Sequence, residues 1–149
     1  MNDKTLELAQ ALSADIAINA SACDDVPAAV RDATGGGARV SIDALGHPQC
    51  ARDSILSLAK LGVHVQVGLL PDGATPLPMN AVIGRELSIA GSHGLAVNRY
   101  PEVLEMVTSG RLNPGRLLSR SLTLDQLPAA LMAMDQDPGT GVSVVTAFR

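Results

Sequence analysis

Ala38-Arg39-Val40-Ser41-Ile42-Asp43-Ala44-Leu45-Gly46 is the stretch that decides the fold, because this β-branched run predicts a strand that ends at a glycine. Residues 50–61 follow with apolar residues at helical spacing, and Gly62 ends that predicted helix. Residues 63–70 then predict a second strand, again closed by a glycine. Two strands joined by one helix through short turns run parallel in one sheet. The sequence therefore predicts an α/β fold.

The same alternation of helices and strands continues on both sides of this unit. Before it, the sequence predicts a helix at 5–12, a short strand at 15–19, and a helix at 26–33 that Asp24 or Asp25 caps. After it come a short helix at 80–84, a strand at 86–92, a helix at 101–109, an extended segment at 117–122, a helix at 127–134 and a final strand at 142–148. This order is typical of a mainly parallel sheet.

Three of the predicted strands end at Gly46, Gly68 and Gly91. Because the carboxyl ends of parallel strands lie at one edge of the sheet, we expect these ends to form one surface, which we call the ledge. Ligands bind beyond this edge, and glycine lets a flat ligand approach the backbone closely. The alternative is that the glycines only end strands.

A second glycine cluster, Thr34-Gly35-Gly36-Gly37, looks like a phosphate-binding loop at first sight. A phosphate loop lies between a strand and the helix that follows it, so that the helix N-terminus faces the anion. Here the glycines follow a helix and precede a strand. The order therefore favours a helix C-cap and turn.

Composition restricts the classes of function. The 149 residues are 46% hydrophobic but only 1% aromatic, so the core is aliphatic. The net charge of −4 and the absence of a basic cluster argue against nucleic-acid binding. No apolar run approaches the ~20 residues that span a bilayer. We expect no membrane partner, and the start of the sequence, which lacks the apolar run of a signal peptide, predicts a cytoplasmic location.

Neither the cysteines nor the histidines form a recognisable metal or catalytic motif. Cys23 and Cys50 are expected to be reduced thiols, and His47 to lie in a solvent-facing turn. His64 is expected at the surface or at a strand end. Asp43, at a strand end, is expected to have a structural or ribose-side role. We therefore assign no catalytic residue and no metal ligand to this sequence.

Six phrases in register resemble the C-terminal, nicotinamide-binding part of the medium-chain dehydrogenase/reductases, of the zinc-containing alcohol dehydrogenase type. The phrases are Thr34-Gly35-Gly36-Gly37-Ala38, Ser41-Ile42-Asp43-Ala44-Leu45-Gly46, Val65-Gln66-Val67-Gly68-Leu69, Gly84-Arg85-Glu86-Leu87-Ser88-Ile89-Ala90-Gly91-Ser92, Ser109-Gly110-Arg111-Leu112 and Leu124-Asp125-Gln126-Leu127-Pro128-Ala129-Ala130-Leu131. No single phrase is diagnostic, but their order and spacing are specific.

This resemblance implies a partial Rossmann-like, doubly wound parallel sheet that lacks its first strands and its glycine-rich loop. Residues 1–116 would be the partial dinucleotide-binding domain, and residues 117–149 a segment that in the family packs back toward the catalytic domain. The implied cofactor is NAD or NADP. By the resemblance, the residues beside the adenine ribose are Ala44, Leu45 and Gly46, and those bordering the nicotinamide are Val67, Gly68, Leu69, Ala90, Gly91 and Ser92.

The departures from the family pattern limit the expected activity. The family's Gly-x-Gly-x-x-Gly fingerprint and its zinc-bearing catalytic domain would lie before Met1, and Ser143 occupies the place of an arginine that reaches the cofactor pyrophosphate. We therefore expect the cofactor-binding C-terminal portion of a zinc-type NAD(P)-dependent alcohol dehydrogenase, with zinc only in the absent N-terminal domain. This portion is expected to be inactive alone.

Two alternatives stay open. One is a truncated, non-catalytic remnant that acts as an oligomerisation or interaction module. The family pairs the strand corresponding to Glu86–Ser92 across a homodimer, and Leu77, Met79, Val82 and Ile83 would add apolar contact area. The other is a small binding domain that keeps the adenine site without the phosphate site.

Overall fold

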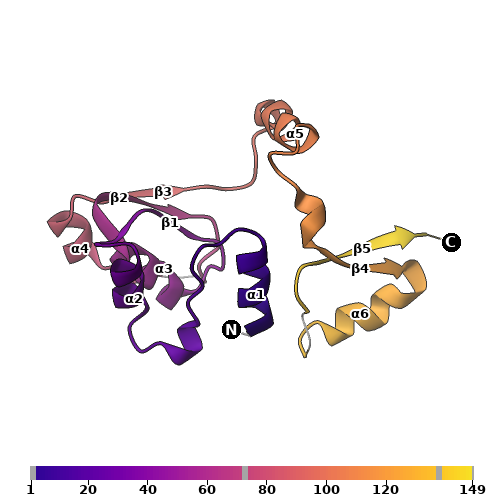
Figure 1. The fold of residues 1–149 in the computed structure, drawn as a ribbon, viewed down its shortest axis with the longest axis horizontal. Helices are drawn as coiled ribbons and strands as arrows, with labels where there is room; N and C mark the ends of the chain where they lie inside the picture. The colour runs from indigo at the N-terminus through magenta and orange to yellow at the C-terminus, as the bar shows by residue number, and fades with distance from the viewer. Residues whose placement is uncertain (1–2, 72–73, 137–138, 149) are drawn as a thin grey trace. The chain divides into compact units, whose positions relative to one another are not determined.

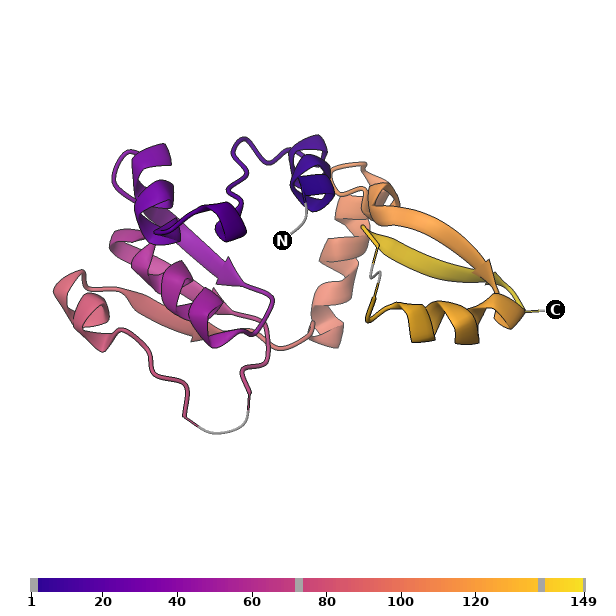
Figure 2. The ribbon, with the colours of Figure 1, turned by 90° about the horizontal axis from the view of Figure 1, so that it is seen from below.

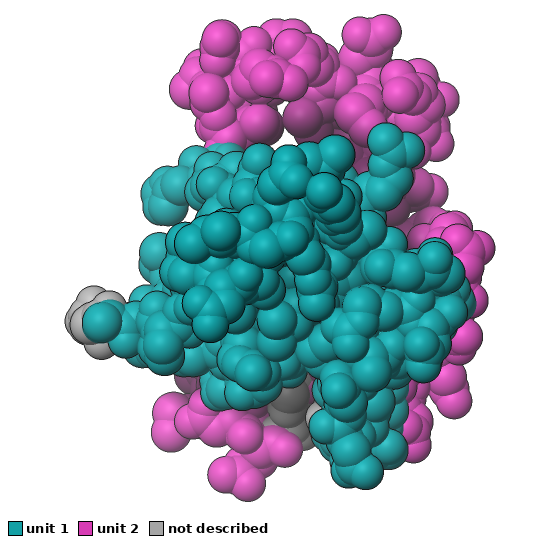
Figure 3. Space-filling view, turned by 90° about the vertical axis from the view of Figure 1, so that its left-hand side faces the viewer, with its two compact units in different colours: residues 1, 16–94 teal, residues 2–15, 95–149 magenta. Residues whose placement is uncertain are grey.

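The computed structural model describes residues 3–71, 74–136 and 139–148 (Figure 1). The chain forms two compact units, coloured separately in Figure 3. The first comprises Ile16–Gly94, and the second comprises Asn2–Asp15 together with Leu95–Arg149. The predicted division into a domain at 1–116 and a segment at 117–149 depends on how that segment packs toward a catalytic domain in the family. It therefore stays a prediction.

A three-stranded parallel sheet organises the first unit. Its strands are β1 (Ala38–Asp43), β2 (Leu58–Gln66) and β3 (Ser88–Gly91), in the order β1-β2-β3. The helix α3 (Pro48–Leu56) connects β1 to β2. The predicted parallel strand–helix–strand unit is therefore confirmed, and so is the α/β class.

Helices cover one face of this sheet. In Figures 1 and 2, α2 (Val26–Ala33) and α3 lie on the same side of the strands, and α4 (Met79–Gly84) precedes β3. The buried apolar cluster consists of Ile55, Leu58 and Leu87, against which Ala38, Leu77 and Val82 pack. Leu77 and Val82 are partly buried against this cluster, and their expected contribution to a dimer stays a prediction. Met79 and Ile83 are exposed.

The predicted helix at 50–61 has different ends, because it begins at Pro48 and stops at Leu56. Leu58 already belongs to β2, and Gly62 lies inside that strand. The Arg85 guanidinium donates to the carbonyl oxygens of Leu56 and Leu58, both at 2.9 Å, and so satisfies the groups that a continued helix would have paired. This cap comes from a residue 29 positions away in sequence, which helical periodicity cannot reveal.

The predicted strand at 15–19 is wrong. These residues are assigned to no strand, and no described strand pairs with them. An apolar run becomes a strand only where a neighbouring backbone completes its hydrogen bonds. Instead, Asn19 caps the short 3-10 helix η1 (Ala20–Ala22) by accepting from the amide of Ser21 at 3.0 Å.

The glycine cluster after α2 is a helix C-cap, as predicted. Thr34 Oγ1 accepts from the Gly37 amide at 3.0 Å, and the Gly36 amide donates to the Arg31 carbonyl at 2.8 Å. Gly37 has φ of 125°, and an added Cβ there would lie 2.5 Å from the Ala59 nitrogen. Backbone geometry and close packing therefore account for this cluster.

The second unit contains a parallel strand pair, β4 (Leu118–Thr123) and β5 (Val142–Ala147), with α6 (Leu127–Ala133) between them in sequence. Figure 1 shows α6 along one side of this pair. The other elements of this unit are α1 (Asp3–Ala11), η2 (Val97–Arg99), α5 (Tyr100–Thr108), η3 (Pro114–Leu117) and η4 (Leu124–Gln126). Thr123 and Gln126 form a capping box at the start of η4.

Candidate functional site

The carboxyl ends of the three strands lie level with one another. In the sheet register, Asp43 of β1 is opposite Gln66 of β2, and Gln66 is opposite Gly91 of β3. The loops that leave these ends therefore start side by side. β1 and β2 end at Asp43 and Gln66, before the predicted ends at Gly46 and Gly68, and β3 ends at Gly91 as predicted. These observed ends form one edge of the sheet.

Asp43 fixes the turn that leaves β1. Its side chain is 4% exposed, and its Oδ1 accepts from the amides of Leu45 at 2.8 Å and Gly46 at 3.0 Å. Its backbone carbonyl accepts from the amides of Val67 and Gly68, both at 2.9 Å. One buried residue thus holds the loop after β1 and the loop after β2.

Gln66 joins the same two loops through its side chain. Its Nε2 donates to Asp43 Oδ2 and to the Gly68 carbonyl, each at 2.8 Å. Its backbone carbonyl accepts from the Ser92 amide at 2.9 Å, which ties in the loop after β3. Every loop of the ledge is therefore in contact with Gln66 or with its hydrogen-bond partner.

The surroundings of Asp43 favour its charged form. Burial acts to raise the pKa of this carboxyl group, but hydrogen bonds from Gln66, Gly46 and Leu45 lower it. The result is a pKa below the ordinary value for an aspartate. The Asp43 carboxylate accepts hydrogen bonds from Leu45, Gly46 and Gln66, and through them it holds the turn after β1 in place. These bonds give Asp43 a structural role.

His64 is buried, and the expectation that it lies at the surface or at a strand end is wrong. Its side chain is 1% exposed, and Nε2 lies 3.1 Å from Gln66 Oε1. Its Nδ1 lies 3.1 Å from the hydroxyl oxygens of both Ser41 and Ser54. The helix α3 covers this face of the sheet, so an imidazole placed between β1 and α3 is enclosed.

A cavity of about 350 Å³ opens at the ends of β2 and β3. It is lined by Gln66, Val67, Gly68, Leu69, Leu70, Gly91, Ser92 and His93. Five of the nine residues that the resemblance assigns to the cofactor thus line one cavity. Ala90 lies in β3 and is exposed, although it does not line the cavity.

The turn of Ala44, Leu45 and Gly46 adjoins the cavity lining through backbone contact. Gly46 has φ of 79°, and an added Cβ there would lie 2.1 Å from the Leu69 carbonyl oxygen. An added Cβ at Gly68 would lie 2.1 Å from the Gly46 nitrogen. These two glycines are therefore required by the packing of one loop on another, and the space that a side chain would fill is occupied by protein.

Gly91 differs from both. No atom lies within 4 Å of the place that its Cβ would occupy. Gly91 also lines the cavity, and its open Cβ position leaves room for a planar ring against the backbone. In this respect the residues present fit a nicotinamide ring.

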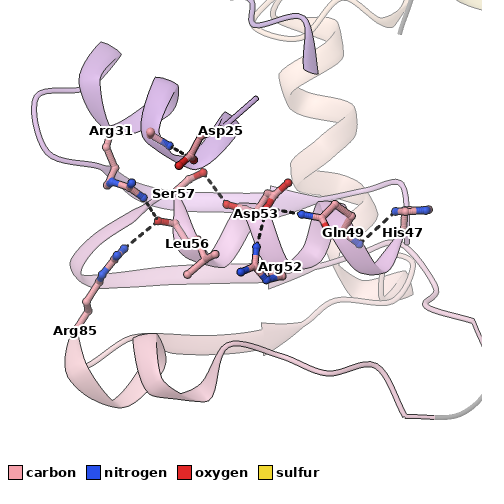
Figure 4. A network of polar contacts seen from close by, with 10 residues as sticks. Asp25, Arg31, His47, Gln49, Arg52, Asp53, Leu56, Ser57 and Arg85 are labelled. Carbon is pink, nitrogen blue, oxygen red and sulfur yellow. Dashed lines mark hydrogen bonds and ion pairs between the residues drawn. The ribbon is translucent and has the colours of Figure 1, made fainter. Parts of the chain in front are cut away.

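A larger cavity, of about 700 Å³, lies between α2 and α3 and is lined by charged side chains of both signs. Figure 4 shows Arg31 and Arg85 pointing at the Leu56 carbonyl, to which they donate at 2.8 and 2.9 Å. His47 accepts from the Gln49 amide at 3.2 Å and caps α3, exposed to solvent as predicted. These side chains complete helix ends.

Cys23 and Cys50 both line this larger cavity, and both are free thiols. Burial, together with the negative charges of Asp43 and Asp53, raises the pKa of the Cys50 thiol. A thiol with a raised pKa is a poor nucleophile and a poor metal ligand at neutral pH. Within residues 3–71, 74–136 and 139–148, no three His, Cys, Asp or Glu side chains are grouped so as to hold a metal ion. The described residues therefore do not fit a zinc centre.

No helix in the described part of the chain is long and apolar enough to span a bilayer.

The sequence reading missed the hydrogen-bonded group beneath the ledge. Ser41 and Asp43 lie two residues apart on β1, and His64 and Gln66 lie two residues apart on β2. The register places Ser41 opposite His64 and Asp43 opposite Gln66. Polar residues two apart on each of two adjacent parallel strands share one face. That spacing, once it is combined with the register of β1 on β2, indicates a polar group between the strands and the covering helix.

Comparison with known proteins gives a consistent result. A family model described as zinc-binding dehydrogenase matches residues 1–109. The (R,R)-butanediol dehydrogenase of Bacillus subtilis is 32% identical over 112 residues, which are 75% of this chain and 32% of that protein. The chain thus spans about a third of the length of this curated relative.

Solved structures resemble the fold over nearly its whole length. The crystal structure of 2R,3R-butanediol dehydrogenase from Bacillus subtilis aligns with a TM-score of 0.85 and 26% identity, over 98% of this chain and 42% of that one. An alcohol dehydrogenase (rspB) from Escherichia coli CFT073, complexed with NADH, aligns with a TM-score of 0.83 over 99% of this chain and 42% of that one. At 24% identity, the second likeness supports the fold alone.

Proposed function

This chain belongs to the zinc-binding dehydrogenase family, and we propose that it is the cofactor-binding C-terminal portion of a zinc-type NAD(P)-dependent alcohol dehydrogenase. The cofactor, when bound, would accept a hydride from an alcohol carbon or, when reduced, would donate one to a carbonyl carbon. The described residues of this chain would bind and orient the nicotinamide at the ledge. Zinc would be held outside these 149 residues.

One observation carries this proposal, namely the cavity of about 350 Å³ at the strand ends. Val67, Gly68 and Leu69, which follow β2, and Gly91 and Ser92, at the end of β3, line it. Backbone amides and carbonyls at strand ends suit the carboxamide of a nicotinamide, and the absent side chain of Gly91 leaves room for its ring. Ala44, Leu45 and Gly46 would lie beside the adenine ribose, and Ala90 would border the nicotinamide from β3.

Calorimetric titration of the full chain with NADH, NADPH and ADP-ribose tests this proposal, since ADP-ribose lacks only the nicotinamide. We expect NADH or NADPH to bind, and the Gly91→Val variant to weaken that binding because its side chain enters the cavity. Gly84→Ala is the matched control, because a Cβ at Gly84 also meets open space but lies in α4. Equal affinity of wild type and Gly91→Val for the dinucleotide contradicts the assignment.

We also propose that the 149 residues do not oxidise alcohols by themselves. Among the described residues no group of His, Cys, Asp and Glu side chains could hold a metal ion, and the only hydroxyl and imidazole groups among the residues that line the cavity are those of Ser92 and His93, which are adjacent in sequence. Alcohol oxidation assays with added zinc are expected to give no turnover. Robust zinc-dependent turnover by this chain would contradict the proposal.

A second function, self-association through β3, has its own support. All four residues of β3 are exposed, and β3 is the last strand in the order β1-β2-β3. An edge strand presents unpaired backbone groups to another strand, and exposed Met79 and Ile83 lie on α4 just before it. Sedimentation equilibrium is expected to give a homodimer, and replacing Ile89 by proline is expected to abolish it. A monodisperse wild-type monomer would reject this second function.

A further inference from the structure

The Gln66 side chain has no unused hydrogen-bonding atom. Its amide nitrogen has two protons, which go to Asp43 Oδ2 and to the Gly68 carbonyl, both at 2.8 Å. Its amide oxygen lies 3.1 Å from His64 Nε2. This side chain therefore bridges the turn after β1, the loop after β2 and the buried histidine.

Asp43 and Gly68 decide which way round the Gln66 amide lies, because a carboxylate and a carbonyl oxygen both need a donor. An amide oxygen only accepts, so His64 Nε2 must be the donor in their contact. Nδ1 of the same ring is held between the hydroxyls of Ser41 and Ser54, each at 3.1 Å. A flipped Gln66 would place its oxygen against two acceptors, the Asp43 carboxylate and the Gly68 carbonyl. One orientation alone satisfies all partners.

We propose that Gln66 is a positioning residue for the nicotinamide, one that sets the spacing of the loops that line the cavity at the ledge. This inference rests on the proposed function. Gln66 itself lines the cavity, its side chain holds the Gly68 carbonyl, and its backbone carbonyl holds the Ser92 amide at 2.9 Å. Gly68 and Ser92 both line the cavity, Gly68 in the loop after β2 and Ser92 directly after β3.

Replacing the amide by a hydrocarbon removes these tethers and leaves the strand in place. In Gln66→Leu, Asp43 Oδ2, the Gly68 carbonyl and His64 Nε2 each lose their partner. The backbone bond from Ser92 to residue 66 is unaffected, so β3 stays paired with β2. We therefore expect the loops of residues 44–46 and 67–69 to loosen while the β2–β3 pairing holds.

Binding and amide exchange measured on the full chain test this proposal. The variants are Gln66→Leu and Gln66→Met, the second being of nearly equal length in case the first does not fold. Gln49→Leu is the matched control, because Gln49 also donates to a carboxylate, that of Asp53 at 2.8 Å, but does so on the surface of α3. NADH and ADP-ribose are the ligands.

Loss of the amide is expected to weaken NADH binding about tenfold, and to weaken ADP-ribose binding less. Amide protons of Leu45, Gly46 and Gly68 are expected to exchange about tenfold faster, with the Ser92 amide unchanged. A purely structural role would lower both affinities equally. The proposal is overturned if the ratio of NADH to ADP-ribose affinity is the same in wild type, the Gln66 variants and Gln49→Leu.

The proposed function and the role of Gln66 are tested separately. If the wild-type chain binds neither NADH nor NADPH, the proposed function fails. The exchange rates of the amide protons of Leu45, Gly46 and Gly68 then decide whether Gln66 positions the loops. If wild type binds NADH and both Gln66 variants bind it equally well, the proposed function stands and the role of Gln66 is rejected.

Discussion

Gln66 Nε2 donates a hydrogen bond of 2.8 Å to Asp43 Oδ2, and this bond joins the carboxyl ends of two adjacent parallel strands. Asp43 holds the turn after β1 with its other oxygen, and Gln66 holds the loop after β2. The edge of the sheet that faces the cavity is therefore shaped by side chains beneath it. Its glycines provide either close loop packing or open space.

Asp43→Asn is expected to destabilise the first unit, because the asparagine cannot accept at both positions. Either its amide nitrogen faces the Gln66 amide protons or it faces the amides of Leu45 and Gly46. One donor then meets another in a buried place, at a cost of about 1–3 kcal/mol in the free energy of unfolding. Urea unfolding monitored by circular dichroism measures it.

Asp53→Asn is the control for that substitution, since the Asp53 carboxylate bonds Gln49 at 2.8 Å and pairs with Arg52 at 3.5 Å near solvent. Its cost is expected to stay below about 1 kcal/mol. An equal loss in the free energy of unfolding for the two substitutions would contradict the larger contribution expected of the buried Asp43 hydrogen bonds.

Acid is expected to weaken the first unit through Asp43. The pKa of this carboxyl group is lower in the folded chain than in the unfolded chain. The unfolded state therefore takes up its proton first as pH falls, and the stabilisation by Asp43 is complete only above its ordinary pKa of about 3.9. It is lost as pH falls further, through the lowered pKa. Urea unfolding of wild type and Asp43→Asn across this range is expected to show the two curves converging in acid, and parallel curves would contradict the shift.

Alanine is expected to have opposite consequences at two glycines of the ledge. In Gly68→Ala the new Cβ would lie 2.1 Å from the Gly46 nitrogen, so the loops must separate, at a cost of about 2 kcal/mol or more. In Gly91→Ala the Cβ meets open space, and we expect a change in the free energy of unfolding within about 0.5 kcal/mol. Thermal or urea unfolding of the pair measures this difference, and similar losses at both sites would refute the packing argument.

The Nε2 atom of His64 is expected to carry the ring proton. Gln66 Oε1, 3.1 Å away, accepts only, because both protons of the Gln66 amide are engaged elsewhere. Long-range proton–nitrogen correlation spectra of labelled chain distinguish the two ring nitrogens. A proton on Nδ1 with a bare Nε2 would show that the Gln66 amide lies the other way round.

The parts of the fold that the sequence predicts correctly are those with local causes. β1 and β2 are apolar runs bounded by turns, and the Thr34–Gly37 cluster follows a helix, so each could be identified from neighbouring residues. The end of α3 could not, because it depends on Arg85 reaching back to Leu56. The strand expected at 15–19 failed for a related reason, since a strand depends on a partner that its own residues do not specify.

The candidate site also has parts that the sequence predicts and parts that it does not. Glycines at strand ends point to the ledge, and Val67, Gly68, Leu69, Gly91 and Ser92 do line one cavity. The burial of His64 depends on α3 crossing above it, with Ser54 supplying a hydroxyl. A polar residue in a strand is equally compatible with solvent and with such a group, and only the register of β1 on β2 separates the two cases.

Titration of isotope-labelled chain with NADH, followed through its backbone amide signals, tests the central claim most directly. Binding at the ledge predicts shifts of Val67, Gly68, Leu69, Gly91 and Ser92 that saturate together, while amides around the cavity between α2 and α3 stay unchanged. No shift at millimolar NADH, or shifts confined to that larger cavity, would contradict the account.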